Sequence, residues 1–421
     1  MKPTFHITQN SPLIDTKLEI RITNLPPYET MTVKADMWDN NGMKWESFAE
    51  LISDGEGNID LATAKPKSGT YLTPDVTGLF WSMCPNANVN RKKRTPLEPL
   101  ETTLSLMKDQ EVLASTQIVR EVVSPEVERK PVRDRGLVGT FFFHPDSEPL
   151  PTVLVLGGSE GGLRESSAAL LASHGFNTFA LAYFGIEDLP KELVNIPLDY
   201  IEEAIEWLSN NSHVDTAKLG IFGTSKGGEL ALLGASMFPV IKAVVGYVPS
   251  GVVYPGLGQS ASGGSSWQYK GKSLPFAYGD VPKTVMEELE QTRHAREPIS
   301  YRKTYQYWAE GEKQAEITVE DIQGPILLIS GGDDQLWPSD VLSEKVISRL
   351  KEHNHSYRYE HIQYPDAGHS FSVPGYSTAQ SVNTPFGSGN LLLGGTPKDN
   401  AQAQFDAWYR MIGFFNDSLK T

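Results

Sequence analysis

The stretch Gly223-Thr-Ser225-Lys-Gly227 combines a potential nucleophile with the small residues that such a nucleophile needs. An apolar segment ending at Phe222 precedes it, and an Ala- and Leu-rich segment reaching Leu233 follows it. Strand, turn and helix in this order hold a serine under backbone strain with its hydroxyl exposed, while the two glycines let neighbouring backbone pass close. The pattern predicts that Ser225 is the nucleophile of a serine hydrolase. A glycine-punctuated turn without chemistry is the alternative interpretation.

A serine in this setting requires an acid and then a histidine later in the chain. The apolar run 325–330 predicts a strand, and it leads into a loop with two aspartates, Asp333 and Asp334. Asp334 is the preferred acid, because Gly331 and Pro338 flank it in the G-x-x-D-x-x-x-P pattern typical of this fold. Asp333 fits a capping or turn residue instead, and an Asx turn without chemistry is the alternative for both.

His369 is the predicted base among the nine histidines of the chain. It lies in a loop after the predicted strand 358–364, and a glycine before it lets that loop approach the nucleophile. The other histidines that we considered are expected to be solvated at a helix end or on an edge-like strand, or to be structural: His353, His355, His361 and His174.

Together these residues form a complete set for acyl transfer. His369 would take the Ser225 proton and return it to the leaving group, while Asp334 fixes the imidazole tautomer and stabilises the imidazolium. The backbone N–H of Lys226 is expected to bind the oxyanion, together with one N–H of the glycine-rich loop 157–162, at Gly158 or Ser159. A phosphate-binding function for this loop is disfavoured, because it lacks the lysine and the Ser or Thr of a P-loop.

The elements around these residues change character near residue 125. Residues 1–125 contain short alternating runs separated by turn signals, which predicts an immunoglobulin-like β-sandwich. A charged, proline-bounded connector, 124–132, follows. Residues 126–421 alternate apolar strands with amphipathic helices, which predicts an α/β domain with a mostly parallel sheet. In the helix expected over 199–210, Asp199 is predicted to be the cap.

Composition restricts the partners and the location. The net charge of −15 argues against nucleic acid and anionic membranes as partners. We find neither a signal peptide nor a run of apolar residues that could cross a membrane, so we predict a soluble, cytoplasmic protein. The single cysteine, Cys84, excludes an internal disulfide and is expected to be buried. The residues predict no metal and no cofactor, and they leave the oligomeric state open.

Several motifs resemble one enzyme family closely over most of the chain. The type I acyl-CoA thioesterases and the related bile acid-CoA:amino acid N-acyltransferases have similar sequences at the elbow around Ser225 and at 24–27, 54–61, 78–83, 174–190, 324–329 and 364–369. The resemblance implies a β-sandwich followed by an α/β-hydrolase domain. It also implies that the nucleophile, acid and histidine of the family correspond to Ser225, Asp334 and His369.

The resemblance further implies the reaction. Transferases of this family typically have cysteine at the elbow and thioesterases serine, so Ser225 favours hydrolysis of acyl-CoA to free acid and CoA through an acyl-serine. Carboxylester or lactone hydrolysis by the same triad and N-acyl transfer to an amino acid are the alternatives. A non-catalytic binding protein that kept the fold is a further alternative, which the complete triad disfavours.

This sequence departs from the family between about 251 and 315 and over 377–398. A lid or acyl-chain pocket would form there, so the identity of the acyl group stays open. The basic run 91–94 could meet CoA phosphates, although a solvated surface run is the simpler interpretation.

Overall fold

The computed structural model describes residues 2–90, 93, 95–258, 264–311, 313–386 and 389–420. They divide into two compact units. The first comprises Met1–Ser124, Val373–Ser381 and Pro397–Phe405, and the second comprises Pro125–Ser372, Val382–Thr396 and Asp406–Thr421. Sequence analysis assigns the two later segments of the first unit to the second domain instead.

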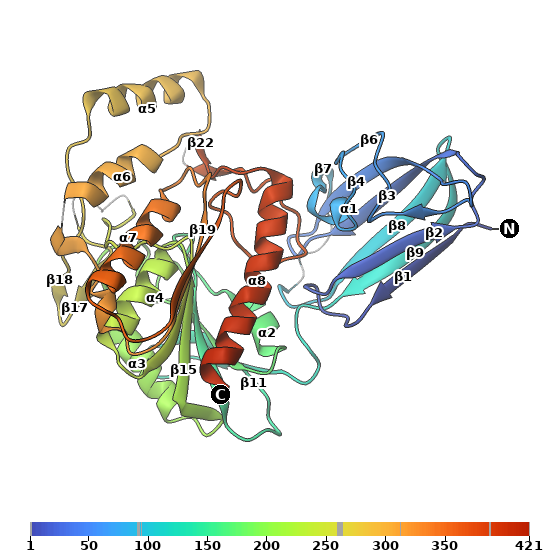
Figure 1. The fold of residues 1–421 in the computed structure, drawn as a ribbon. Helices are drawn as coiled ribbons and strands as arrows, with labels where there is room; N and C mark the ends of the chain where they lie inside the picture. Colours follow the sequence, from blue (N-terminus) through green and yellow to red (C-terminus); the bar gives the residue numbers. More distant parts are fainter. Residues whose placement is uncertain are drawn as a thin grey trace. The chain divides into compact units, whose positions relative to one another are not determined.

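The first unit is a β-sandwich of two antiparallel sheets, coloured blue to cyan in Figure 1. Alternate residues of its strands are buried, as in β3, and the inward-facing side chains of both sheets form one hydrophobic core. The smaller sheet consists of β1 (Thr4–Gln9), β2 (Leu18–Thr23) and β5 (Ile59–Asp60). The larger sheet has the order β6 (Ser68–Gly69), β4 (Met43–Ile52), β3 (Thr30–Trp38), β8 (Leu100–Lys108) and β9 (Glu111–Arg120), with β7 (Cys84–Asn90) also on β4 and the short helix α1 (Gly78–Trp81) beside it.

The expectation that Cys84 is buried is wrong. Its side chain is exposed, whereas Met83 directly before it is fully buried. Successive side chains of an extended segment point in opposite directions, so the burial of Met83 turns Cys84 outward.

The second unit is built on one eight-stranded sheet. Its first two pairings are antiparallel and the remaining five are parallel, as a mostly parallel sheet requires. The strand order is β10 (Glu128–Val132), β11 (Val138–Phe143), β13 (Asn177–Ala182), β12 (Leu150–Leu156), β15 (Val214–Thr224), β16 (Ile241–Tyr247), β19 (Ile326–Gly331) and β20 (Tyr359–Tyr364). Strands β11 and β13 are buried along their whole length, which explains their continuous apolar sequence.

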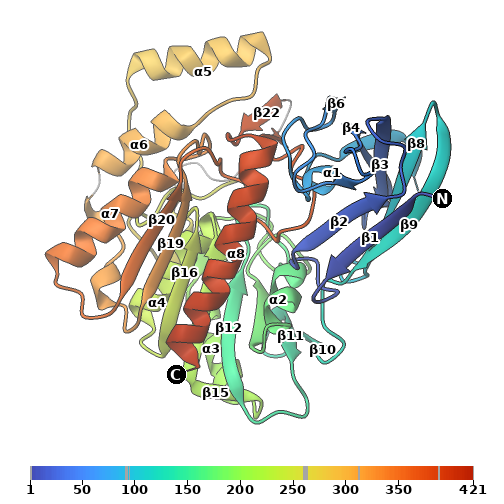
Figure 2. The ribbon, with the colours of Figure 1, turned by 45° about the vertical axis from the view of Figure 1, so that its right-hand side comes forward.

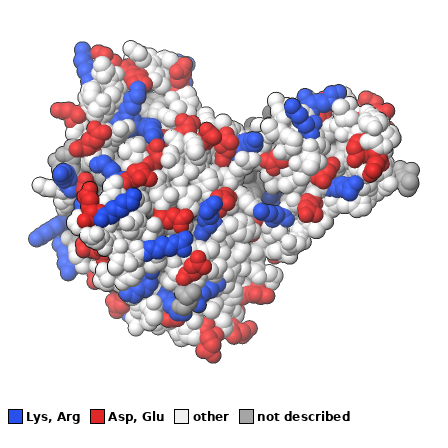
Figure 3. Space-filling view, in the orientation of Figure 1, with Lys and Arg blue, Asp and Glu red and all other residues white. Residues whose placement is uncertain are grey.

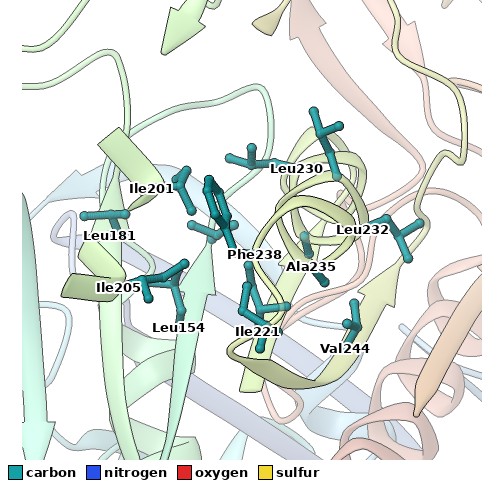
Figure 4. Close-up of a cluster of buried hydrophobic side chains, with 14 of the residues drawn as sticks. Leu154, Leu181, Ile201, Ile205, Ile221, Leu230, Leu232, Ala235, Phe238 and Val244 are labelled. Carbon is teal, nitrogen blue, oxygen red and sulfur yellow. The ribbon is translucent and has the colours of Figure 1, made fainter. Parts of the chain in front are cut away.

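Helices cover both faces of this sheet (Figure 2). The helices on its two faces are α2 (Glu165–Ala172) and α8 (Pro397–Leu419) on one, and α3 (Asp199–Ser209) and α4 (Lys226–Met237) on the other, while α7 (Ser339–Glu352) packs on β19 and β20. Consecutive residues of β15 face opposite helices: Gly220 lies against Phe415 of α8, whereas Ile221 packs with Phe238 in the core between the sheet, α3 and α4 (Figure 4). This layered sheet is the expected α/β-hydrolase fold.

Helix α3 begins differently from the expectation. The cap position is Leu198 and carries no side-chain cap, so the prediction that Asp199 caps the helix is wrong. The Asp199 carboxylate instead accepts a hydrogen bond from the backbone N–H of Lys270, at 3.0 Å. A partner distant in sequence has replaced the local cap.

The region expected to vary, about 251–315, leaves the sheet between β16 and β19, and its described residues contain the helices α5 (Lys283–Ala295) and α6 (Arg302–Gly311). Figure 1 shows them in yellow and orange. The short elements here and in neighbouring loops are β14 (Ile196–Pro197), β17 (Trp267–Tyr269), β18 (Lys272–Ser273), and the 3-10 turns Lys313–Ala315 and Val319–Asp321. The run 256–266 of this region is rich in Gly and Ser, and its residues 259–263 lie outside the described part of the chain. The later departure contains the hairpin β21 (Asn383–Phe386) and β22 (Gly389–Leu392).

The surface in Figure 3 carries acidic and basic side chains side by side over the face in view. No helix in the described ranges is long and apolar enough to cross a membrane.

Phe179 is a test of the core of the second unit. Its ring is fully buried in β13, stacks on Trp207 at 5.0 Å between centroids and fills the space beside Gly139. Phe179→Ala should lower the free energy of unfolding by about 3–5 kcal/mol, measured by denaturant titration. The exposed Tyr357 gives a control, since Tyr357→Ala should change it by less than about 0.5 kcal/mol. Equal losses in both variants would contradict this account of the core.

Candidate active site

Ser225 lies between the end of β15 and the start of α4. Its backbone has φ 57° and ψ −120°, a strained conformation for a residue with a side chain. The flanking glycines are sterically required, since a Cβ at Gly223 would lie 1.9 Å from the Gly227 carbonyl oxygen, and one at Gly227 would lie 2.2 Å from that of Gly157. The backbone expected for a nucleophile elbow is therefore present.

The structure brings Ser225, His369 and Asp334 into one hydrogen-bonded chain. His369 Nε2 lies 2.9 Å from Ser225 Oγ, and His369 Nδ1 lies 2.8 Å from Asp334 Oδ2. Asp334 is completely buried, and its other oxygen accepts the backbone N–H groups of Leu336 and Trp337 at 3.1 and 3.3 Å. The carboxylate thus has a fixed orientation toward the imidazole. This arrangement allows His369 to accept the Ser225 proton while its second nitrogen donates to Asp334.

The acid and histidine loops meet at glycines. A Cβ at Gly331 would lie 2.3 Å from the carbonyl oxygen of Gly368, and a Cβ at Gly368 would lie 2.2 Å from that of Gly394. Both loops also donate to one acceptor, since the carbonyl oxygen of Leu393 receives the N–H of His369 at 2.8 Å and that of Gln335 at 3.3 Å. The segment after β22 therefore holds the loops of His369 and Asp334 together through Leu393.

Sequence analysis missed these supporting residues. Arg302 donates to the Asp334 carbonyl oxygen at 2.8 Å and pairs with Asp340. The Gln335 carbonyl accepts the N–H of Tyr301 at 3.1 Å and the Ser300 hydroxyl at 2.8 Å. Arg302, Tyr301 and Ser300 lie in the region 251–315, for which the sequence offers no pattern, so no local signal points to them.

The remaining candidates have other partners. Asp333 accepts the Gly395 N–H at 2.8 Å and the Gln335 side-chain amide at 2.7 Å, as a turn residue does. The expectation of a solvated His361 is wrong: its side chain is only 5% exposed. It bonds to Ser330 Oγ at 2.7 Å and to Glu344 at 2.6 Å, because α7 covers this strand.

Two of the expected oxyanion donors, Lys226 and Gly158, are neighbours of Ser225. Lys226 is the first residue of α4, and the N–H groups of a first helical turn have no acceptor within the helix. Gly158 is adjacent to the nucleophile, since a Cβ there would lie 3.3 Å from Ser225 Cβ. Its N–H donates to Glu160 Oε1 at 3.1 Å, so this donor is engaged in the present structure. Ser159, the alternative, is exposed.

The loop that carries Gly158 is held by a hydrogen bond from Tyr183. The Tyr183 hydroxyl donates to the carbonyl oxygen of Gly157 at 2.6 Å, and burial raises the pKa of Tyr183 well above its ordinary value. The phenol therefore stays a hydrogen-bond donor at neutral pH.

Two further expectations concern ligands. Arg91, Lys92 and Arg94 of the basic run lie outside the described residues. Within the described ranges, no three His, Cys, Asp or Glu side chains gather in a way that could hold a metal ion.

The sheet, the strained serine and the buried relay define the class of this protein as an α/β-hydrolase with a Ser-His-Asp triad arrangement. Residues 196–421 match the family model described as "BAAT / Acyl-CoA thioester hydrolase C terminal", and residues 15–134 match "Acyl-CoA thioester hydrolase/BAAT N-terminal region". The chain belongs to this BAAT / acyl-CoA thioester hydrolase family.

Curated relatives match over nearly the whole chain. Mitochondrial acyl-coenzyme A thioesterase 2 of Rattus norvegicus is 31% identical over 96% of this chain and 87% of its own. The peroxisomal succinyl-coenzyme A thioesterase of Mus musculus is 30% identical over 96% of this chain and 94% of its own. Among solved structures, a putative dienelactone hydrolase of Klebsiella pneumoniae is 17% identical, covering 69% of this chain and 97% of its own, with a TM-score of 0.42.

The two adjacent aspartates allow a matched test of the relay. Asp334→Asn should slow phosphonylation of Ser225 by a fluorophosphonate about 10⁴-fold, because the amide no longer holds the required imidazole tautomer. Asp333→Asn keeps an oxygen that can accept from Gly395 and should retain the rate within a few-fold. The rate constant is measured by intact-protein mass spectrometry, and equal rates in the two variants would refute the assignment of the acid.

Gly368 tests the close approach of the histidine loop. Gly368→Ala should displace the loop from Gly394 and lengthen the contact from His369 to Ser225, reducing phosphonylation about 10²-fold. Gly389→Ala is the control, because a Cβ at that glycine meets nothing within 4 Å. An unchanged rate in Gly368→Ala would mean that the loop position does not depend on this contact.

Proposed function

We propose that this chain is a serine-dependent thioesterase that hydrolyses acyl-CoA to a free acid and CoA. The observation that carries the proposal is the hydrogen-bonded chain from Ser225 through His369 to Asp334 in a member of a family whose relatives are named acyl-CoA thioesterases. Serine at the elbow, where the resembling transferases have cysteine, favours water as the acceptor over an amino acid.

In the acylation step, Ser225 Oγ attacks the thioester carbonyl carbon while His369 Nε2 takes the hydroxyl proton. The carbonyl oxygen becomes an oxyanion next to the N–H of Lys226 and of Gly158 or Ser159, with Gly158 available once its bond to Glu160 opens. The C–S bond then breaks, and the CoA thiolate takes the proton from His369. A thiolate is a good leaving group, so this step is easier than amide cleavage.

In the deacylation step, water attacks the acyl-serine carbonyl carbon and transfers a proton to His369. The C–O bond to Ser225 breaks, the proton returns to Oγ, and the free acid leaves. Asp334 stays ionised in both steps, holds the imidazole tautomer and stabilises the imidazolium.

The location within the cell stays a prediction. The cytoplasmic assignment is an expectation from the sequence, and named relatives include a mitochondrial and a peroxisomal protein.

The proposal predicts thiol release from a panel of short to long acyl-CoAs. Release should fall at least about 10³-fold in Ser225→Ala and should not increase when glycine or taurine is added. Ser236→Ala on the same helix is the control, since its hydroxyl donates to the carbonyl oxygen of Leu233 in its own helix and should be dispensable. Thiol release is followed with a chromogenic disulfide.

Other outcomes identify the alternatives. Brisk cleavage of a simple ester without thiol release would replace the proposal with a carboxylesterase or lactone hydrolase. Conjugates of the acyl group with glycine or taurine, detected by mass spectrometry, would replace it with an N-acyltransferase.

A further inference from the structure

Two charged side chains that the acyl-transfer steps do not use are buried in the first turn of α4. The side chains of Lys226 and Glu229 are 2% and 0% exposed. Lys226 Nζ lies 3.1 Å from Glu229 Oε1 and 3.0 Å from Oε2. Both residues therefore lie within about one helical turn of Ser225, and one of them, Lys226, is the residue whose backbone N–H is the expected oxyanion donor.

The pair connects α4 to the segment 254–267, of which 254–258 and 264–267 are described. Glu229 Oε1 accepts the indole N–H of Trp267 at 2.7 Å and the backbone N–H of Tyr254 at 3.3 Å. Lys226 Nζ donates to Ser266 Oγ at 2.8 Å and to the carbonyl oxygen of Tyr254 at 3.4 Å. The ammonium also lies within 6 Å of the ring centroids of Tyr254 and Trp267.

Packing alone does not explain this pair. Desolvating two charges costs about as much as their attraction returns, so apolar residues of similar volume would stabilise the fold equally well or better. An uncompensated carboxylate in the first turn of α4 would also oppose negative charge that develops at the helix N-terminus, where the dipole otherwise favours an anion. A carboxylate at this position therefore requires a neutralising partner.

We propose that Lys226 and Glu229 are a positioning pair for the oxyanion site. Glu229 fastens Tyr254 and Trp267 to α4, and Lys226 neutralises that carboxylate so that charge developing on the substrate oxygen is not opposed. The inference rests on the acyl-transfer function proposed above and assigns the Lys226 side chain a task separate from that of its backbone.

The charge of Glu229 should depend on pH when the Lys226 ammonium is removed. Glu229 contacts the Lys226 ammonium, the Trp267 indole and the backbone N–H of Tyr254. Besides burial, its charge also raises the pKa of the Tyr183, Tyr254 and Tyr305 phenols. Burial raises the pKa of Glu229 and lowers that of Lys226, and the neighbouring ammonium partly offsets the rise at Glu229. Removing the ammonium therefore raises the Glu229 pKa further. Glu229 is then neutral at low pH and becomes an uncompensated anion as pH rises through that pKa.

The test compares Lys226→Met, Glu229→Gln and the double variant. The readouts are the inhibition constant of an alkyl boronate, which forms a tetrahedral adduct on Ser225, and the phosphonylation rate per active site titrated, from neutral to alkaline pH. Lys226→Met should lose about tenfold or more in boronate affinity as pH rises, whereas the double variant should follow the wild-type profile. Lys226→Arg, which keeps the cation, should also retain affinity.

A matched control is Arg349→Met on α7. It breaks a bidentate ion pair in which two guanidinium nitrogens of Arg349 each lie 2.6 Å from a carboxylate oxygen of Glu320. It should lower stability and leave the boronate profile unchanged. A pH-independent loss in Lys226→Met that the double variant does not restore would overturn the proposal. Neither probe is a thioester, so these results stand even if acyl-CoA is not the substrate.

If Lys226→Met does not fold, Glu229→Gln is compared with Glu229→Ala. Gln keeps an oxygen that accepts from Trp267 and Tyr254, whereas Ala removes the attachment of the segment to α4. Boronate affinity should be retained in the first and fall about tenfold in the second. Equal affinity in both would overturn the proposal.

Discussion

The presentation of the Ser225 hydroxyl depends on a close approach of backbone to backbone at the end of β15. The Gly227 Cα lies against the carbonyl oxygen of Gly157, and the Gly223 Cα lies against that of Gly227, so no side chain fits at either glycine. The same approach places the loop after β12 beside Ser225, which directly precedes the first residue of α4. The strained φ of Ser225 persists because the sheet on one side and the helix on the other over-determine it.

The hydrogen-bonded chain of Ser225, His369 and Asp334 joins the end of β15 to the ends of two further strands of the sheet. Ser225, Asp334 and His369 follow the carboxyl ends of β15, β19 and β20, and parallel strands bring those ends to one edge. The sheet alone does not fix the distances between the side chains of Ser225, His369 and Asp334. Leu393 receives backbone N–H groups from both the histidine loop and the acid loop, and Arg302 holds the acid loop through a carbonyl oxygen.

This division explains what could be predicted from the sequence. The elbow, the strand before Asp334 and the glycine before His369 are local patterns with a steric cause, and the structure brings all three side chains together. Leu393, Gln335 and Arg302 act through backbone atoms or long-range bonds, which impose no pattern on their neighbours. Asp199 and Cys84 were mispredicted for a related reason. Asp199 accepts the N–H of the distant Lys270 instead of capping its own helix, and Cys84 is exposed although the apolar residues before it suggested burial.

The segments that were expected to depart from the family bond directly to the loops that carry Asp334 and His369. The strand pairing of Ile299 with Leu391 joins the region before α6 to the hairpin β21–β22, and both connect to Gln335. Glu229 in turn attaches the segment that ends at Trp267 to the helix of the nucleophile. A sequence change that reshapes these segments therefore also acts on the position of the loops that carry Asp334 and His369. Because hydrogen bonds of this kind tolerate shifts of only a few tenths of an ångström, insertions here are compatible with an intact relay only where the contacts to Gln335, His369 and Glu229 are preserved.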